Sequence, residues 1–481
     1  MPAPIYLSTA EILRRTEALF GAERSLDLTS AIADKTREIA RYDVMGMRRV
    51  AAVEAWGRSG SVLLASYLDA HEDVIMLPAL HSDGIHRFSM LYASLTLQQK
   101  LLAYPVFVAL YDAQSEGAGC GRSLFAGPFA IATTDYYASV QAICEAASAW
   151  PQDFVSSRRA LFLLIHVAYN VALGRRPASA TPLIVSAQHG RDDARAARFV
   201  EDFPEAKFIH TVRDPVCALD RTFDWFFDPL LLEDRQPSSG KRTGGAEVLH
   251  PARYISLLAP LTALETLIGA DRPHPGMEAR TRAVRFEDMH CNLAETMREL
   301  AAWLGIGYRA TLLESSFNGI PYVVTREGQS WSGSRPDKAS PPVRHIAPRD
   351  RALVRALFYQ DFLAWNYPCP RAFGSALMRA LVLCLFSVCP MRAEFIVARA
   401  ALKRRIWPWL RRGNVSIPID SLLRILYSRL AIAWLVLRAL PSCFSRREAR
   451  LELSQPGRAA AISTRSPFAG EFDPASTITG K

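Results

Sequence analysis

The chain has 481 residues, of which half are hydrophobic and 22% are charged, a composition that supports packed cores and excludes global disorder. Its length suits roughly two to four units of ~150 residues. The net charge of +10 favours anionic partners such as nucleotides, acidic glycans or lipid headgroups. A nucleic-acid partner would rest on this charge alone, and we do not expect one.

The eight cysteines are scattered, with neither a C-x-x-C pair nor a His–Cys cluster at metal-ligand spacing. They predict reduced, mostly buried thiols in a cytoplasmic protein and no metal site. The first twenty residues lack a basic segment followed by an apolar run, so no cleaved signal peptide is expected.

Taken in chain order, the pattern alternates strands with helices. Residues 8–42 predict polar helices, and 88–174 are largely helical. Short apolar runs predict buried strands at 50–56, 73–78, 182–187, 207–212 and 282–286. Helices are expected between them at 61–70, 191–202, from Pro215 onward, 250–269 and 292–304. This alternation predicts an α/β fold whose central parallel sheet is covered by helices on both faces.

The character of the chain changes after residue 370. Residues 375–389 and 420–441 are strongly apolar, and residues 403–412 between them are basic and aromatic. Arginines interrupt both apolar runs, so neither is a clean membrane span of ~20 residues. Two interpretations have equal weight: helices lying in the plane of a membrane surface, or a helical hairpin packed on the sheet. We expect an N-terminal helical segment at 1–45 and an α/β domain at 46–370. A helical extension at 371–450 and a disordered tail at 451–481 should follow.

The sequence WGRSGSVLL joins the first predicted strand to the helix that follows it. Gly57 and Gly60 would let the backbone approach an anion, to which the first helical N–H groups point. Arg58 can hold two phosphate or sulfate oxygens, and Ser59 and Ser61 add hydroxyl donors. The motif is not a Walker A loop. Taken alone, a capped helix with Arg58 on the surface explains it equally well.

The order RSGS, apolar helix, LDAHEDV resembles the 5′-phosphosulfate motif of sulfotransferases that use 3′-phosphoadenosine-5′-phosphosulfate (PAPS). The likeness is closest to the tyrosylprotein and bacterial carbohydrate branches of that family. It implies a three-layer, P-loop-like fold in which residues 57–62 bind the donor. Ser61 stands where the family has Thr. Val62 replaces a second hydroxyl residue, so any contact there falls to its backbone N–H.

The phrase FPEAKFIHTVRDP resembles a second motif of the same family. The resemblance implies that Arg213 binds the 3′-phosphate of PAPS, and Pro215 would begin a helix whose N-terminus favours anions. The alternative is an Arg213–Asp214 pair on the surface. The family usually has Ser eight positions after this Arg. Here the position is Arg221, which either contacts the 3′-phosphate as a cation or marks degenerate binding.

Two weaker likenesses follow, and together the four cover about residues 48–365. VRFEDM at 284–289 matches a family phrase, but we favour a structural interpretation, a strand-to-helix turn capped by Asp288. REGQSW at 326–331 resembles the late loop that closes over the nucleotide, which implies contacts from Arg326 and Gly328.

The sequence offers several candidates for the catalytic base. The tyrosylprotein branch has Glu soon after LDAHPDV, where this chain has Pro78 and Ala79. His189 is the first substitute, since a neutral imidazole can take a proton from an alcohol. His81 competes with it, as does His86, whereas His71 and His210 read as structural. Arg58 is the other residue expected to act on the transferred group.

The sequence therefore predicts a sulfotransferase that uses PAPS as donor, needs no metal and acts on a hydroxyl of a carbohydrate or lipo-oligosaccharide. A peptide tyrosine is the second acceptor candidate. A kinase-like enzyme and an inactive nucleotide-binding scaffold are the alternatives. The missing Walker A lysine argues against the first, and Val62 and Arg221 support the second. We expect a cytoplasmic protein, and peripheral membrane contact through residues 375–441 is one of the two interpretations of that segment.

Overall fold

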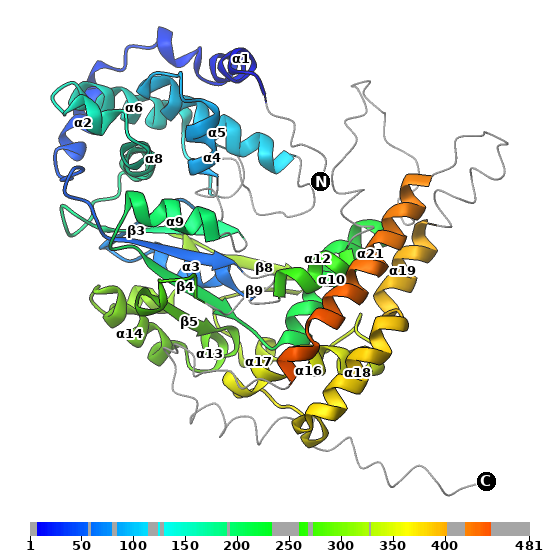
Figure 1. Ribbon diagram of the computed structural model, residues 1–481. Coiled ribbons are helices and arrows are strands. Elements are labelled where there is room, and N and C mark those ends of the chain that lie inside the picture. Colours follow the sequence, from blue (N-terminus) through cyan, green and yellow to red (C-terminus); the bar gives the residue numbers. More distant parts are fainter. Residues whose placement is uncertain are drawn as a thin grey trace, which may run out of the picture.

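A parallel sheet forms the centre of the protein (Figure 1). The computed structural model describes residues 7–55, 59–78, 84–113, 124–125, 129–189, 193–232, 259–267, 273–326, 329–401 and 419–443. Within them, five strands pair in the order β2-β3-β1-β4-β5, all parallel. Their bounds are β1 (Val50–Ala55), β2 (Val74–Met76), β3 (Leu183–His189), β4 (Lys207–Val212) and β5 (Thr281–Arg285).

Helices cover both faces of this sheet, because successive side chains of a strand point to opposite faces. Val50 and Ala52 enter one hydrophobic core with α5 (Leu97–Ala113), α6 (Thr133–Ala147), α8 (Arg158–Ala172) and α9 (Asp193–Asp202). Ala51 and Val53 enter another core with α3 (Ser61–Asp69) and α14 (Leu293–Leu304). The expected α/β arrangement of three layers is confirmed.

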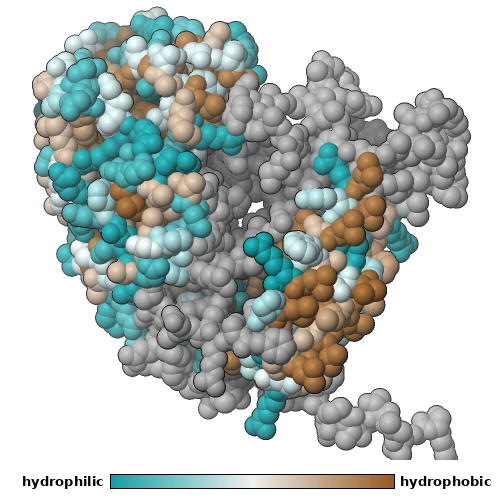
Figure 2. Space-filling model, in the orientation of Figure 1, coloured by the Kyte–Doolittle hydropathy of each residue, from teal (hydrophilic) through white to brown (hydrophobic). Residues whose placement is uncertain are grey.

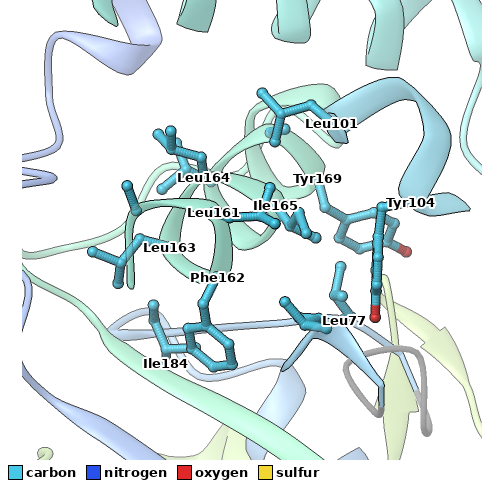
Figure 3. Packing of buried hydrophobic residues seen from close by; sticks show 14 of the residues in the cluster. Leu77, Leu101, Tyr104, Leu161, Phe162, Leu163, Leu164, Ile165, Tyr169 and Ile184 are labelled. Carbon is cyan, nitrogen blue, oxygen red and sulfur yellow. The ribbon is translucent and has the colours of Figure 1, made fainter. Parts of the chain in front are cut away.

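The first of these cores is dominated by α8, nearly all of whose side chains are buried. Figure 3 shows Phe162 of this helix beside Ile184 of β3 and near Leu77. The N-terminal helix α1 (Thr9–Phe20) buries Ile12 and Phe20 in the same core, and α2 (Thr29–Ile39) buries Ile39 there. Hydrophobic packing therefore crosses the boundary expected at residue 45.

A third core lies beyond the carboxyl ends of β4 and β5. It joins α10 (Pro215–Leu232), α12 (Ala259–Leu267), α16 (Pro348–Leu357) and α17 (Tyr359–Ala364) to α18 (Ala376–Val388), α19 (Arg392–Ala401) and α21 (Ile419–Arg438). The C-terminal helices pack on α12 and α16, and not flat on the sheet as a hairpin, because helices already cover both sheet faces (Figure 1). This core crosses the boundary expected at residue 370. The expected tail at 451–481 lies outside the described residues.

Two short antiparallel hairpins were not predicted. They are β6 (Ser316–Phe317) with β7 (Ile320–Pro321), and β8 (Val323–Arg326) with β9 (Gln329–Ser332). The remaining elements are η1 (Glu23–Ser25), α4 (Ile85–Leu91), α7 (Gln152–Val155), η3 (Glu278–Arg280), α13 (Phe286–Cys291), η4 (Ala310–Leu313), α15 (Pro336–Ala339), η5 (Arg371–Gly374) and η7 (Leu440–Cys443).

The described cysteines are all free thiols, and Cys120 lies outside the described residues. Only Cys443 among those described is fully buried; Cys384 is exposed and the others are half-buried. The expectation of mostly buried thiols is wrong, because these cysteines lie at the margins of the cores.

Candidate functional site

The first candidate element is the turn that leads from β1 into α3. Ser59 is 2% exposed, and its Oγ lies 2.7 Å from Oγ1 of Thr211 on β4. Gly60 is the N-cap of α3 with φ +92°, a left-handed conformation that favours glycine. Ser61 and Val62 form the first turn of α3. Residues 56–58 lie outside the described residues, so the contacts expected of Gly57 and Arg58 are not part of this geometry.

Gly60 also allows a close approach between this turn and α13. A Cβ atom at Gly60 would lie 2.5 Å from Cδ2 of Phe286 and 3.0 Å from Cε of Met289. The same Phe286 ring lies 4.0 Å from the guanidinium carbon of Arg213, in a cation–π contact. One aromatic ring therefore connects the first motif with the second.

The second motif lies at the end of β4. Arg213 is 9% exposed. Oδ1 of Asp214 accepts hydrogen bonds from the backbone N–H groups of Val216, at 2.8 Å, and Cys217, at 3.0 Å, and so caps α10. Burial raises the pKa of Asp214, although these hydrogen bonds and the charge of Arg213 oppose the rise. The alternative of an Arg213–Asp214 pair on the surface is wrong, because Arg213 is buried and the Asp214 carboxylate caps α10.

Ser59 and Arg213 border one cavity of about 40 Å³, which we call the β1–β4 cavity. Its lining residues are Ser59, Thr211, Val212, Arg213, Pro215, Ala218, Leu267, Phe358, Asp361 and Trp365. This volume holds about one or two waters, whereas ligand pockets measure roughly 300–1,000 Å³. The described residues therefore enclose only a part of any nucleotide site.

Some residues of this cavity were missed by sequence reasoning. Asp361 and Trp365 come from the α17 region, far along the chain from both motifs. No local motif marks them, and only the packing of α17 beside the end of β4 brings them there. An acidic and an aromatic side chain thus face the same space as Arg213.

The third likeness has a structural role, though not the expected one. Arg285 is the N-cap of α13, which has no side-chain cap, so the expected capping by Asp288 is wrong. Glu287 instead accepts a hydrogen bond from the backbone N–H of Asp214, at 3.1 Å, and another from the hydroxyl of Tyr367, at 2.8 Å. Burial raises the pKa of Glu287, although Arg285 and the nearby Arg213 oppose the rise. This carboxyl group fixes the backbone beside Arg213.

The other expected donor contacts are only partly described. Arg221 lies on α10, half-buried, and is not among the described residues that line the β1–β4 cavity. Its neighbour Asp220 accepts hydrogen bonds from three successive backbone N–H groups at 344–346, which ties α10 to that segment. Arg326 ends β8 opposite Gln329, but its side chain and Gly328 lie outside the described residues.

Among the candidate bases, His189 has the most informative position. It is the last residue of β3 and pairs with Ala55, the last residue of β1. Its backbone therefore lies at the carboxyl edge of the sheet, beside the start of the loop; its side chain lies outside the described residues. His81 is also outside them. Nε2 of His86 lies 3.6 Å from Oδ2 of Asp202, and burial lowers the pKa of His86.

Glu54, His210 and His274 form a buried group under the same sheet edge, and His274 also contacts the exposed Asp193. Nε2 of His274 lies 2.7 Å from Oε1 of Glu54, and Nε2 of His210 lies 2.6 Å from Oε2 of Glu54. Nδ1 of His274 lies 2.5 Å from Oδ1 of Asp193. These are hydrogen-bond lengths, shorter than the ~3.3 Å between ligand atoms around a tetrahedral zinc ion with bonds of ~2.0–2.1 Å.

In this arrangement the side chains contact one another directly, at distances shorter than those between the ligands of a zinc ion. Glu54 and His274 are fully buried, and His210 nearly so. Burial acts to raise the pKa of Glu54, but the hydrogen bonds from His210 and His274 outweigh it and lower the pKa to about 2. Glu54 is thus an ionised carboxylate that links β1 to β4 and to the segment before β5.

No protein-family model matches this chain, and no curated protein does. Its function is therefore inferred from the β1–β4 cavity and from the two motifs that border it.

Proposed function

We propose that the chain is a PAPS-dependent sulfotransferase with a P-loop-like core, which transfers a sulfuryl group to an acceptor hydroxyl. One observation carries the proposal. Ser59, from the motif that resembles a phosphosulfate loop, and Arg213, from the motif that resembles a 3′-phosphate site, line the same cavity. Chance resemblances on unrelated surfaces would not be expected to converge.

The topology supports a ligand site at the carboxyl end of β1, the strand whose following turn borders the cavity. The loop after β1 leads to α3 on one face of the sheet, whereas the loop after β3 leads to α9 on the other face. Open parallel sheets bind ligands where such loops diverge, at the carboxyl ends of the strands. The N-terminus of α3, reached through the left-handed Gly60, adds backbone N–H groups suited to an anion.

Each motif would hold one end of the donor. Residues 57–62 would bind the 5′-phosphosulfate, with Arg58 stabilising charge on the transferred group. Arg213 would bind the 3′-phosphate, already positioned by the Phe286 ring, so that less ordering is needed on binding. Arg221, Arg326 and Gly328 are further candidate contacts.

In the reaction, the acceptor oxygen forms a bond to sulfur while the bond from sulfur to the phosphate oxygen breaks. The electron pair of that bond leaves with 3′-phosphoadenosine-5′-phosphate (PAP). His189 is the proposed base for the hydroxyl proton, because its strand ends beside the loop after β1. His81 is the second candidate. The acceptor would be a carbohydrate or lipo-oligosaccharide, or else a peptide tyrosine, and the protein would act in the cytoplasm.

The test uses the full chain. The full-length protein should bind PAP more tightly than ADP and transfer label from ³⁵S-labelled PAPS to a hydroxyl acceptor. Tighter binding of ADP would point instead to an enzyme that uses nucleoside triphosphates. Binding of PAP without transfer to any glycan, lipo-oligosaccharide or tyrosine peptide would favour the non-catalytic scaffold, which Val62 and Arg221 already support.

A further inference from the structure

The C-terminal helices expose an unusual amount of apolar surface. On α18 the exposed side chains include Leu377, Leu381, Leu385 and Val388, at helical spacing. On α21 they include Leu423, Tyr427, Leu430, Trp434 and Leu437, again along one stripe. The two helices pack together, and Figure 2 shows apolar residues gathered over this region. We call these two stripes the α18–α21 apolar face.

The opposite sides of these helices are also apolar. Leu383 and Phe386 of α18, and Ile432 and Val436 of α21, are buried in the third core with α10, α12 and α16. A helix that is apolar all round is normally covered on all sides. Exposed patches of this kind mark sites of interaction with a protein or a membrane.

Two of the four arginines that interrupt these segments in the sequence point away from the face. Arg379 is buried: its guanidinium donates to the carbonyl oxygens of Phe373 and Gly374 and stacks on Tyr359, 4.1 Å from the ring centroid. Arg429 donates to the carbonyl oxygen of Phe386, at 2.9 Å. Both charges point between the helices, so these two arginines do not interrupt the outward stripes, whereas Arg438, beside Leu437, is exposed.

The exposed charges near the face are positive. Arg371 lies in η5 and Arg392 and Arg399 lie in α19, elements that pack on α18 and α21, and Arg438 ends α21. All four are exposed, and we call them the arginine margin. Among the described side chains of α18, α19 and α21, the one acidic group, Glu394, is directed to Arg429, at 3.5 Å. Residues 371–443 contain twelve basic and two acidic residues, an excess of ten that equals the net charge of the whole chain.

We infer that the α18–α21 apolar face docks in the plane of a lipid bilayer that contains anionic headgroups. Apolar side chains with Trp and Tyr would enter the interface, and the arginine margin would meet the headgroups. A second copy of the chain fits less well. A twofold interface would place this margin against its own equivalent, so that like charges would repel.

The geometry favours lying on the membrane over crossing it. Residues Ala376–Arg399 have the length of a membrane span, with 24 residues, and an 18-residue window within them has a mean hydropathy of 1.9. However, a break at 389–391 divides them between α18 and α19. The 13 residues of α18 extend ~20 Å at 1.5 Å per residue, short of the ~30 Å hydrocarbon core. The inner sides of α18 and α21 are held by the third core. This docking does not depend on which reaction the β1–β4 cavity performs.

The test is co-sedimentation of the full chain with vesicles of phosphatidylcholine, with and without phosphatidylglycerol. The wild type should pellet with the anionic vesicles and be released by added salt. The double variant Leu381→Glu/Leu430→Glu should bind at least about tenfold more weakly, since each leucine loses apolar burial. Both side chains are exposed, at 58% and 61%, so folding should be retained. The matched control Leu26→Glu/Met90→Glu changes side chains of similar exposure elsewhere, and should bind like the wild type.

A second measurement avoids new charges. Brominated phosphatidylglycerol should quench the tryptophan fluorescence of the wild type, and Trp434→Phe should remove part of that quenching. Wild-type protein that stays in the supernatant, or a double variant that pellets as the wild type does, would overturn the inference. So would a wild-type dimer that Leu381→Glu/Leu430→Glu converts to a monomer, because the face would then be covered by a second copy.

Discussion

Replacing Gly60 by alanine tests the contact that joins the two motifs. Gly60 has φ +92°, and a Cβ atom there would lie 2.5 Å from Cδ2 of Phe286. The ring cannot simply retreat, because the guanidinium of Arg213 packs on it at 4.0 Å. The substitution should therefore strain the backbone, displace Phe286 and disturb Arg213.

The size of the effect follows from two terms. A non-glycine residue in the left-handed region costs about 1–2 kcal/mol, and forcing a methyl group into a packed site costs a further ~1–3 kcal/mol. Gly60→Ala should thus lower the free energy of unfolding by about 2–5 kcal/mol. Gly174 is a matched control, with φ +70° and no atom within 4 Å of an added Cβ. Gly174→Ala should lower the free energy of unfolding only by the cost of the left-handed backbone, about 1–2 kcal/mol.

Urea denaturation, followed by tryptophan fluorescence, measures both variants against the wild type. Titration with PAP then asks whether the ring displacement reaches Arg213: Gly60→Ala should bind PAP more weakly, and Gly174→Ala should not. Equal loss of stability in the two variants would refute the close contact with Phe286. Unchanged PAP affinity in a strongly destabilised Gly60→Ala protein would refute the coupling to Arg213.

Three further predictions concern the surrounding residues. Glu54→Gln should lower stability by about 3 kcal/mol near neutral pH, because the carboxylate pKa is depressed from 4.5 to about 2 by His210 and His274 against the effect of burial. A carboxylate whose pKa is depressed on folding stabilises the folded protein at pH values above its unfolded pKa of 4.5. The difference in free energy of unfolding between the wild type and Glu54→Gln, measured in urea, should therefore narrow as pH falls from 4.5 toward 2. A difference that stays constant over this range would contradict the assignment. His189→Ala should abolish sulfuryl transfer from labelled PAPS while PAP still binds, and wild-type turnover would exclude it as the base. Arg58→Ala should weaken PAP binding in calorimetric titration by about 1.5–3 kcal/mol, as a lost charge-assisted hydrogen bond does; an unchanged affinity would remove this residue from the site.

The strands of the sheet could be predicted because each is a short apolar run between turn signals. β4 begins and ends where the run KFIHTV does, and β1 follows its predicted span as far as Ala55, with Trp56 outside the described residues. Strand order could not be read in the same way, because it depends on which runs pair across long helical connections. The hairpins β6–β7 and β8–β9 were missed because their strands are very short and mostly exposed, so they lack the alternation that marks a half-buried strand.

The candidate site was predictable only where local sequence carries its chemistry. Ser59 and Arg213 stand in motifs, and their neighbouring strands bring them together. Asp361 and Trp365 carry no local signal, because they reach the site through packing between distant elements. Phe286 stands in the phrase VRFEDM, but its contact with Gly60 could not be read from that phrase. The direction of Arg379 on α18 and of Arg429 on α21 was likewise not predictable, because it depends on carbonyl groups and rings supplied by neighbouring elements.

Binding of PAP and of adenosine 5′-phosphate, compared in the wild type and in Arg213→Ala, tests the central claim most directly. The two ligands share the adenosine and the 5′-phosphate and differ in the 3′-phosphate. If Arg213 binds that group, the wild type should prefer PAP by roughly 10- to 100-fold, the worth of a charged hydrogen bond, and Arg213→Ala should lose most of this preference while binding adenosine 5′-phosphate as before. A preference for PAP that survives in Arg213→Ala, or none in the wild type, would contradict the account.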